Sequence, residues 1–409
     1  MPVVPVSAES IRLNQPVPFA LRDSAGMVLV ARGGVVASEE ARQQLQERGL
    51  YIDMADADAF KKAVAGKMDS MVRGNSKLGQ IAKAEEAVDA AEVAEVAQNM
   101  ATQARALRTD PDLTWDGLAV KMATALREPS KEDFLDRMNR LEADLLHLLS
   151  GDVDAALLTL IYSASTELQK YSVRHALLVS VITELAARQF GTWPNEWRSP
   201  LRRAAMTMNI AMTSLQDQLA MQDSGTSAHQ REQISSHAQR GVNQLRDLGV
   251  VDELWLAAVE HHHSSPPGPL ASMEPAMQIA RLIKRADIFA ARLSPRKTRA
   301  AMTATAAARA AYLDENQQTD EAGAAIIKAT GIYPPGCFVR LASGEVAVVI
   351  QRGAKATTPL VACVLGSKGL PMAKPMVRDT RHKAHEISGT AAPHEVRVRL
   401  SIASLLELT

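Results

Sequence analysis

Residues 275–293 read PAMQIARLIKRADIFAARL, and this stretch has the repeat of an amphipathic helix. Ala276, Ala280 and Ile283 precede Asp287 at steps of four, three and four, so all four residues fall on one helix face. That face is apolar except for Asp287. Because a carboxylate turned into a core is unfavourable unless it is paired or bound to a metal, Asp287 is the strongest single indication of a site.

The same helical repeat continues through the middle of the chain and predicts a single all-α domain. Further segments with this repeat are Phe134 to Leu149, Ala155 to Phe190, Leu201 to Met221, Ala228 to Leu248 and Glu253 to His262. The composition agrees, since 46% of the residues are hydrophobic but only 4% are aromatic, which favours packed helices over a large β-sandwich. We expect a mainly α protein.

Two smaller modules are expected beside the helical domain. Alternation around residues 19–22 and 27–31 predicts a hairpin that turns at residues 23–26, and Ser38 is expected to cap a helix from Glu39 to Arg48. After Gly331 apolar residues recur at every second position, as in the strands of a β-sheet. Strands are expected at Phe338 to Leu341, Val346 to Ile350, Leu360 to Leu365 and Val396 to Leu400. The predicted domains are an α/β module at 1–60, a helical linker at 61–132, the helical domain at 133–330 and a β extension at 331–409.

The predicted linker is rich in Ala, Glu, Lys and Gln from Ala63 to about Arg108, and Asp110-Pro111 should end it. Its apolar stripe is thin and poor in Leu and Ile, which favours a solvated connecting helix over a coiled coil. A homodimer formed through this helix stays open as an alternative.

Charge and cysteine content exclude several classes of function. The 409 residues include 46 basic and 46 acidic residues, so no overall field attracts a nucleic acid polymer or an anionic membrane. No uncharged run reaches the about 18 residues of a membrane span, and the start MPVVPVSAES is unlike a signal peptide. Cys337 and Cys363 have neither disulfide nor zinc spacing. We therefore expect a soluble, cytoplasmic protein with no membrane span.

The histidines gather in the helical domain, which holds His175, His229, His237, His261, His262 and His263. Such a cluster indicates metal binding or proton chemistry. Neighbouring His261 and His262 diverge by about 100° on a helix, so each is expected to reach a different ion of a pair. His229 and His263 are assigned to the surface or to supporting positions. Alternatively, each buried histidine is a hydrogen-bonded core residue, Asp287 pairs with Arg281 or Arg285, and the HHHSSPPG run is a polar loop.

Four segments together resemble the HD-GYP family of HD-superfamily phosphohydrolases, over about residues 160–315. They are YSVRHALLVSVITELA (171–186), HAQRG (237–241), AVEHHH (258–263) and RADIFAARLSPRKTR (285–299). The spacing of 24 residues from His237 to His261 also agrees with the family. The N-terminal module and the final GIYPPGCFVRLASGEVAVVI (331–350) look like regions that flank such domains. The resemblance implies an all-α phosphodiesterase fold that hydrolyses cyclic di-GMP with two or three iron or manganese ions.

Carried over by position, the resemblance assigns metal ligands and one ligand-binding arginine. The metal ligands are His175, His237, His261, His262 and Asp287, and the arginine is Arg296. The family's HDxGK motif falls on MNIAM (208–212). There Met208 replaces the histidine, Asn209 the aspartate and Met212 the lysine.

These replacements remove chemistry that the family needs. Asn209 offers a neutral oxygen where an anion should bridge two metals, Met208 a soft thioether, and Met212 no cation for a phosphate. Tyr171 stands where some members have an additional glutamate ligand, which argues against a third metal. The segment after His262 is shorter than the GYP loop and has His263 in place of its glutamate.

We therefore expect a degenerate HD-GYP protein that acts as a non-catalytic or impaired regulator and binds regulatory protein partners. It is expected to hold at most one iron or manganese ion at partial occupancy, or none. One alternative is an active phosphodiesterase that hydrolyses cyclic di-GMP. Another is a scaffold similar to the HDOD domains, which bind proteins without catalysis. Whether cyclic di-GMP binds is left open by the sequence.

Overall fold

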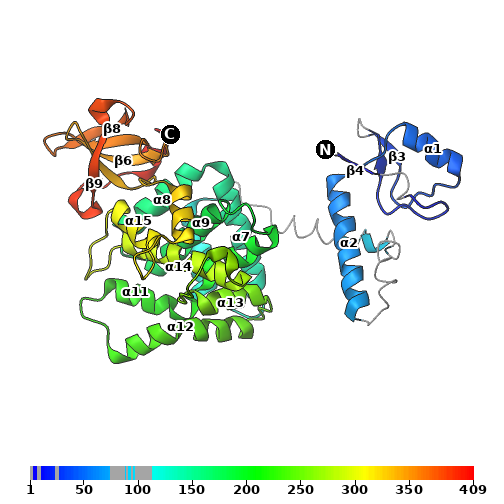
Figure 1. The fold of residues 1–409 in the computed structure, drawn as a ribbon, viewed down its shortest axis with the longest axis horizontal. Helices are drawn as coiled ribbons and strands as arrows, with labels where there is room; N and C mark the ends of the chain where they lie inside the picture. Colours follow the sequence, from blue (N-terminus) through cyan, green and yellow to red (C-terminus); the bar gives the residue numbers. More distant parts are fainter. Residues whose placement is uncertain are drawn as a thin grey trace. The chain divides into compact units, whose positions relative to one another are not determined.

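The computed structural model describes residues 3–6, 11–23, 27–73, 88, 91–93, 95–96 and 113–409 (Figure 1). The chain divides into two compact units, Met1–Arg108 and Thr109–Thr409. The predicted turn at 24–26, most of the Ala/Glu-rich segment with its proposed dimer contact, and the break at Asp110-Pro111 lie outside the described residues. The four-part domain division stays a prediction.

The first unit contains the small α/β module that the sequence predicts. Its antiparallel sheet has the order β1-β4-β2-β3, formed by β1 (Val3–Pro5), β4 (Tyr51–Asp53), β2 (Leu21–Arg22) and β3 (Val28–Val30). Helix α1 (Glu39–Glu47) starts where predicted, because the Ser38 side chain accepts a hydrogen bond from the Ala41 N–H. Helix α2 (Met54–Arg73) follows β4 directly. Phe19, Leu21 and Ile52 form part of the core.

The second unit is built around helix α9 (Tyr171–Ala187), which is buried on all sides. An all-round apolar sequence such as ALLVSVI is typical of a central helix. The helices that follow one another along the unit are α6 (Trp115–Arg127), α7 (Phe134–Gly151), α8 (Val153–Thr166), α9, α10 (Arg198–Thr207), α11 (Thr213–Met221), α12 (Ala228–Asp247), α13 (Glu253–His261), α14 (Pro275–Leu293), α15 (Ala304–Tyr312) and α16 (Glu321–Thr330). Helices α8, α10, α11, α14 and α16 all contact α9. The prediction of a mainly α protein is confirmed.

Two of the predicted helical segments are broken in the structure. The segment from Ala155 to Phe190 divides into α8 and α9, because Lys170 takes a left-handed conformation with φ 53°. The segment from Leu201 to Met221 divides at Asn209, where a short 3₁₀ turn, η3 (Ile210–Met212), separates α10 from α11. Both breaks lie next to predicted site residues.

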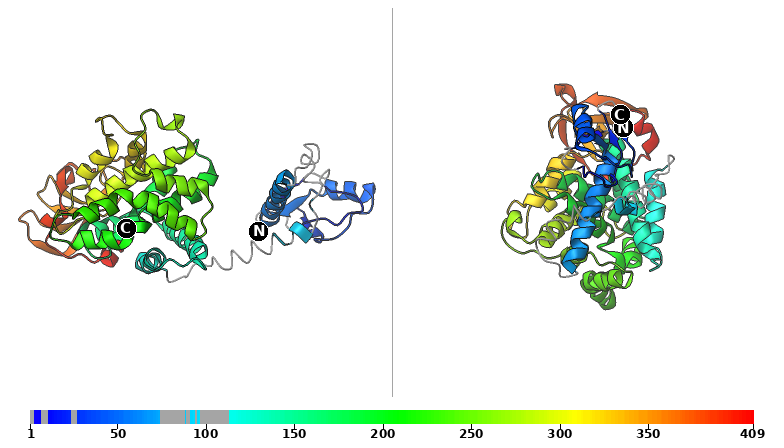
Figure 2. Two further views of the ribbon diagram at one scale, coloured as in Figure 1. Left: turned by 90° about the horizontal axis from the view of Figure 1, so that it is seen from below. Right: turned by 90° about the vertical axis from the view of Figure 1, so that its right-hand side faces the viewer.

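The C-terminal β unit is an antiparallel sheet at one end of the helices (Figures 1 and 2). Its order is β8-β7-β6-β5-β9, formed by β8 (Pro371–Asp379), β7 (Leu360–Leu365), β6 (Val346–Gln351), β5 (Phe338–Leu341) and β9 (Ile387–Ala391). Gly336 lets the chain approach α8 closely, since a Cβ there would lie 2.7 Å from the Leu158 oxygen.

The strand predicted at Val396 to Leu400 is wrong, because this segment has no strand partner. A 3₁₀ turn, η6 (Pro393–Glu395), leads the chain away from β9. The segment then packs against α8, and the Leu400 N–H donates to the Tyr162 hydroxyl at 3.1 Å.

Within the described residues, no single helix has both the length and the apolar character needed to cross a membrane. Helices α7 and α8 meet that test only when taken together, and they are bent by 114° at their junction.

Candidate metal centre and arginine loop

Three histidines converge in the helical domain. His237 comes from α12, His262 follows the last residue of α13, and His263 comes next in the chain. The Nε2 atom of His237 lies 3.2 Å from Nε2 of His262 and 3.2 Å from Nε2 of His263. All three residues offer a ligand atom within 4.8 Å of the others, so one metal ion could contact all three. We call His237, His262 and His263 the histidine trio.

Two members of the trio are oriented by main-chain carbonyl groups. Nδ1 of His237 lies 2.5 Å from the Ile234 oxygen, and Nδ1 of His262 lies 2.6 Å from the Val259 oxygen. With the proton on Nδ1, each ring donates to the carbonyl and leaves Nε2 free to accept a metal. Metal-binding histidines commonly make such a second hydrogen bond, so the arrangement fits a metal site.

The trio is electrically suited to bind a cation at neutral pH. Burial lowers the pKa of His237 and lowers that of His262 to about 3. Burial also lowers the pKa of the more exposed His263. The neutral imidazole is the form that binds metals, so these rings need not lose a proton first.

His175 and Asp287 form a second pair next to the trio. Nε2 of His175 lies 2.7 Å from Oδ1 of Asp287, and the Asp287 side chain is 21% exposed. Burial opposes ionisation of Asp287, but the hydrogen bond and the charge of His175 outweigh it and hold the pKa of Asp287 at about 2. The charge of Asp287 in turn acts to raise the pKa of His262 and His263, so the pair lies within electrostatic reach of the trio.

The alternative partners considered for Asp287 are engaged elsewhere. Arg281 and Arg285 pair with Asp320 at 2.8 Å and 2.9 Å. The acidic residue on the apolar face of α14 therefore belongs to the histidine cluster and not to a structural ion pair with its own helix.

His261 lies outside the trio, and His263 takes part instead. On a continuous helix His261 and His263 would point about 200° apart. Helix α13 ends at His261, however, so His263 leaves the helical path and its ring lies 4.0 Å from that of His262. His263 was expected at the surface or in a supporting position, and the resemblance placed it where the family has a glutamate. The turn-forming sequence SSPPG (264–268) indicates a helix end before it, and this signal could have added His263 to the predicted ligands. Ligation by His261 stays a prediction.

The residues on which the resemblance places the HDxGK motif lie at the break between α10 and η3. Met208 is buried, Asn209 precedes η3, and Met212 follows one turn later. Gly241 of α12 faces this break, since a Cβ there would lie 4.0 Å from the Met208 oxygen and 3.6 Å from Val259. The break at Met208 therefore lies next to α12 and α13, the helices that lead to the trio.

Asp217 and Asp223, the two aspartates that follow the break in the chain, are engaged elsewhere. Asp217 accepts from the Ser172 N–H at 2.9 Å and pairs with Arg127 at 2.5 Å. Asp223 pairs with Lys297 at 2.5 Å. Among the described residues, the trio is the group of three or more His, Cys, Asp or Glu side chains whose ligand atoms lie close enough to share one metal ion. All of its donors are nitrogens.

A second feature of the site is the loop after α14, which contains Arg296 and Arg299. The Arg296 guanidinium lies 5.4 Å from the centre of the Tyr171 ring, and Tyr171 stacks on His175 at 5.6 Å. The Nε atoms of both arginines are buried without a hydrogen-bond partner among the described residues. Burial and the neighbouring Arg296 lower the pKa of Arg299. Neither arginine pairs with a described carboxylate, so this arginine loop carries positive charge available to an anion.

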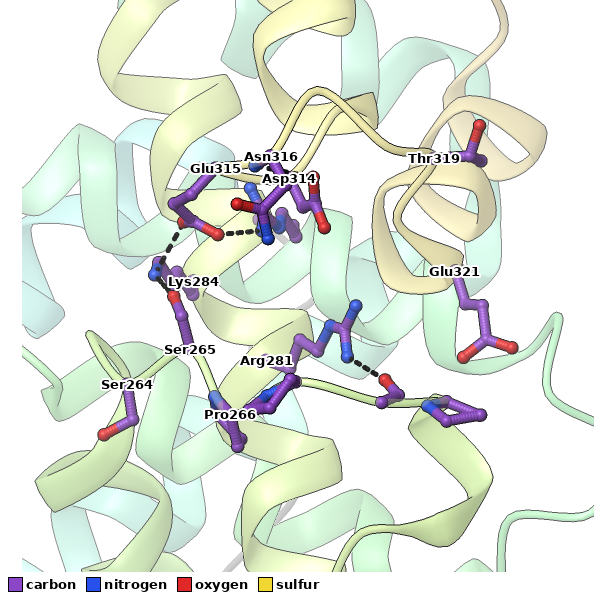
Figure 3. A pocket seen from close by; sticks show the side chains of 14 residues that line it. Ser264, Ser265, Pro266, Arg281, Lys284, Asp314, Glu315, Asn316, Thr319 and Glu321 are labelled. Atoms are coloured by element: carbon purple, nitrogen blue, oxygen red, sulfur yellow. Dashed lines mark hydrogen bonds and ion pairs between the residues drawn. The ribbon is translucent and has the colours of Figure 1, made fainter.

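A cavity of about 400 Å³ is lined in part by the loop that starts at Ser264, the residue after His263 in the chain (Figure 3). The loop Ser264–Pro269 forms one side, α14 contributes Arg281 and Lys284, and residues 314–321 lie opposite.

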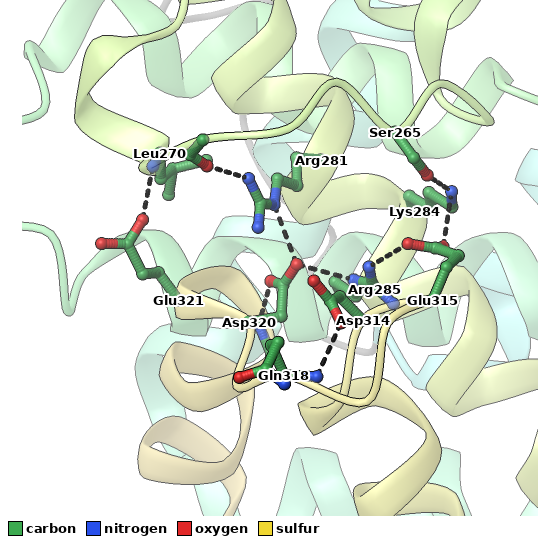
Figure 4. Close-up of polar contacts among 12 residues, drawn as sticks. Ser265, Leu270, Arg281, Lys284, Arg285, Asp314, Glu315, Gln318, Asp320 and Glu321 are labelled. Carbon is green, nitrogen blue, oxygen red and sulfur yellow. Dashed lines mark hydrogen bonds and ion pairs between the residues drawn. The ribbon is translucent and has the colours of Figure 1, made fainter.

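The charges of this cavity are already balanced (Figure 4). Glu315 lies 2.9 Å from Lys284 and 3.1 Å from Arg285, and Asp320 joins Arg281 to Arg285. Burial opposes ionisation of Glu315, but its hydrogen bond to Lys284 prevails and lowers its pKa to about 2. The cavity is therefore a weaker candidate for anion binding than the arginine loop.

The fold and the site together define a mainly helical domain that holds a histidine cluster and carries a β unit at its C-terminus. No family model matches the chain. It is 27% identical over 231 residues to the cyclic di-GMP phosphodiesterase PA4108 of Pseudomonas aeruginosa, covering 54% of each protein. The chain thus spans about half the length of this curated relative. The solved HDG"Y"P protein Bd1817 from Bdellovibrio bacteriovorus is 12% identical, with a TM-score of 0.41, over 80% of this chain and 99% of that one. The chain is thus similar to a cyclic di-GMP phosphodiesterase over about half of its length.

Proposed function

We propose that the chain is a regulatory relative of the cyclic di-GMP phosphodiesterases in which one metal ion stabilises the site and hydrolysis is lost or severely impaired. The observation that carries this proposal is a trio of nitrogen donors in a chain that has Asn209 where the resemblance expects a bridging aspartate. Two-metal hydrolysis requires a shared anionic ligand to hold both ions and the attacking water between them.

The donor set of the trio favours a particular kind of metal. Iron and manganese were expected from the resemblance, but these ions prefer sites that include oxygen ligands. Three neutral imidazoles with a further open position suit zinc. When bound, zinc would supply a Lewis acid, while His237, His262 and His263 would hold it. Asp287 would keep His175 in place and offset part of the positive charge.

The arginine loop supports binding of cyclic di-GMP as a ligand. A phosphodiester anion would satisfy the partnerless Nε atoms of Arg296 and Arg299 and use the positive charge that no described carboxylate offsets. In this proposal the nucleotide acts as a signal that is bound and released intact, and a protein partner reads the bound state.

Metal analysis and calorimetry of the full chain test the proposal, with protein purified under anaerobic conditions. We expect at most one metal ion per chain, cyclic di-GMP binding, and no linear product on chromatography. His237→Ala should remove the metal, whereas His229→Ala, an exposed histidine on the same helix, should retain it.

Other outcomes separate the alternatives. Two or more ions per chain together with hydrolysis would establish an active phosphodiesterase and overturn the proposal. Absence of both metal and nucleotide binding would leave the HDOD-like scaffold.

A further inference from the structure

A second cavity, of about 680 Å³, lies on the second unit away from the residues of the trio. One wall is the end of α8 from Tyr162 to Leu168. The loop after α14 contributes Pro295 and Ala301, and the remaining wall is the segment from Pro393 to Ile402. This open cavity thus runs between the helical domain and the tail of the β unit.

The tail segment VRVRL, Val396 to Leu400, has the side-chain pattern of a strand without a strand partner. Val396 is buried and Val398 and Leu400 are half-buried against the core of the β unit, whereas Arg397 and Arg399 are exposed. The Leu400 N–H bonds to Tyr162, which fixes one end of the segment. The N–H and C=O groups of Arg397, Val398 and Arg399 make no hydrogen bond to any other described residue.

The two arginines are also without counter-charges. Neither forms an ion pair with a described carboxylate, although both line the cavity. Glu167 lines it too, but its carboxylate pairs with Arg174, and the adjacent Glu395 pairs with Arg340. Main-chain groups without a hydrogen bond to a described residue and two positive charges without a described ion pair therefore occur on the same short segment.

We propose that this tail segment binds an extended acidic segment of a partner protein. Main-chain hydrogen bonds to residues 397–399 would add a strand, as in β-augmentation. Acidic side chains at every second position of the partner would face Arg397 and Arg399, because side chains two apart in a strand share a face. The three free residues span about 10 Å, longer than a single phosphate, and this favours a peptide over a small anion. The inference does not depend on the metal centre.

Fluorescence anisotropy with the full chain tests the proposal. The probe is a labelled octapeptide of alternating Thr and Glu, compared with the isomer Glu-Glu-Thr-Thr-Glu-Glu-Thr-Thr, in which no two Glu lie two positions apart. We expect the alternating peptide to bind at least about tenfold more tightly, because only its acids stand two apart on one face and can meet both arginines. Arg397→Glu with Arg399→Glu should abolish binding, and Arg397→Gln with Arg399→Gln should weaken it about tenfold or more.

The matched control changes two other exposed cations of the β unit, Lys355→Glu and Lys374→Glu, and should leave binding unchanged. Unfolding curves that match the parent chain would show that the arginine variants fold. Equal binding of both peptides would overturn strand pairing. Tight binding of tripolyphosphate with full displacement of the peptide would identify a small-anion site and also overturn the proposal.

Discussion

Replacement of Asp287 by Asn tests the electrostatic design of the candidate centre. The change preserves the size of the side chain and removes its charge, so that the new amide resembles a permanently protonated acid. The pKa of Asp287 lies at about 2, compared with an ordinary value of 3.8. A shift of this size corresponds to about 2 kcal/mol of net stabilisation by the ionised form: burial opposes it, and the hydrogen bond to His175 is the largest favourable contribution.

The sign of the pH dependence follows from the lowered pKa. The stabilisation by Asp287 is present above its unfolded pKa, about 4, and is lost as the pH falls towards 2. The difference between parent and Asp287→Asn should therefore be about 2 kcal/mol at pH 7 and should shrink below pH 4.

Urea unfolding of the metal-free protein, followed by tryptophan fluorescence, measures this difference. All 4 tryptophans lie between Trp115 and Trp255, so the signal reports the second unit. Asp223→Asn is the matched control, because its ion pair with Lys297 is exposed and should contribute less than about 1 kcal/mol. A loss below about 0.5 kcal/mol for Asp287→Asn would refute the reasoning.

Three further predictions concern the centre and the junction with the β unit. The pKa of His262 is about 3, below the ordinary 6.5, so the metal-free protein should lose stability as the pH drops from 6.5 towards 3. Urea unfolding at pH 7 and pH 5 measures this loss, and equal stability at the two pH values would contradict the prediction. Gly336→Ala should destabilise the protein by more than about 2 kcal/mol, since φ is +92° and the new Cβ would meet main-chain atoms at 2.7 Å and 2.8 Å. The control Gly369→Ala, at φ +75° with open space around the Cβ, should destabilise it by only about 1 kcal/mol, and thermal unfolding compares the two. Met208→His with Asn209→Asp should raise metal content above one ion per chain by elemental analysis, and unchanged content would mean that the break at η3 cannot present ligands.

The helical part of the fold could be predicted from the sequence because burial imposes a regular spacing. The spacing that places Asp287 on an apolar face reports the packing of α14 directly. The break at Lys170 could not be predicted, since a left-handed lysine depends on the surrounding packing and not on its own preference. Alternation at Val396 to Leu400 correctly indicated one buried face, but alternation does not show whether a strand has a partner.

For the candidate site, the sequence pointed to His237, His262, His175 and Asp287 but not to how they group. His175 and Asp287 are 112 positions apart, and their hydrogen bond depends on the contact between α9 and α14. The place of His263 depends on one helix ending a residue earlier than expected. Both are consequences of tertiary structure and local chain direction, which residue spacing alone does not contain.

The donors that converge at the candidate centre are nitrogens. Asp287 is engaged with His175, and the described group that could hold a metal ion is the histidine trio. Buried polar groups that serve no purpose destabilise a fold when they lose their partners, so a site drifting without function would be expected to exchange them for apolar residues. Instead, His237 and His262 each keep a carbonyl partner for Nδ1 and direct Nε2 towards the other ring. This orientation, in a place where a smaller apolar residue would pack without it, supports the proposal that the trio binds a metal ion.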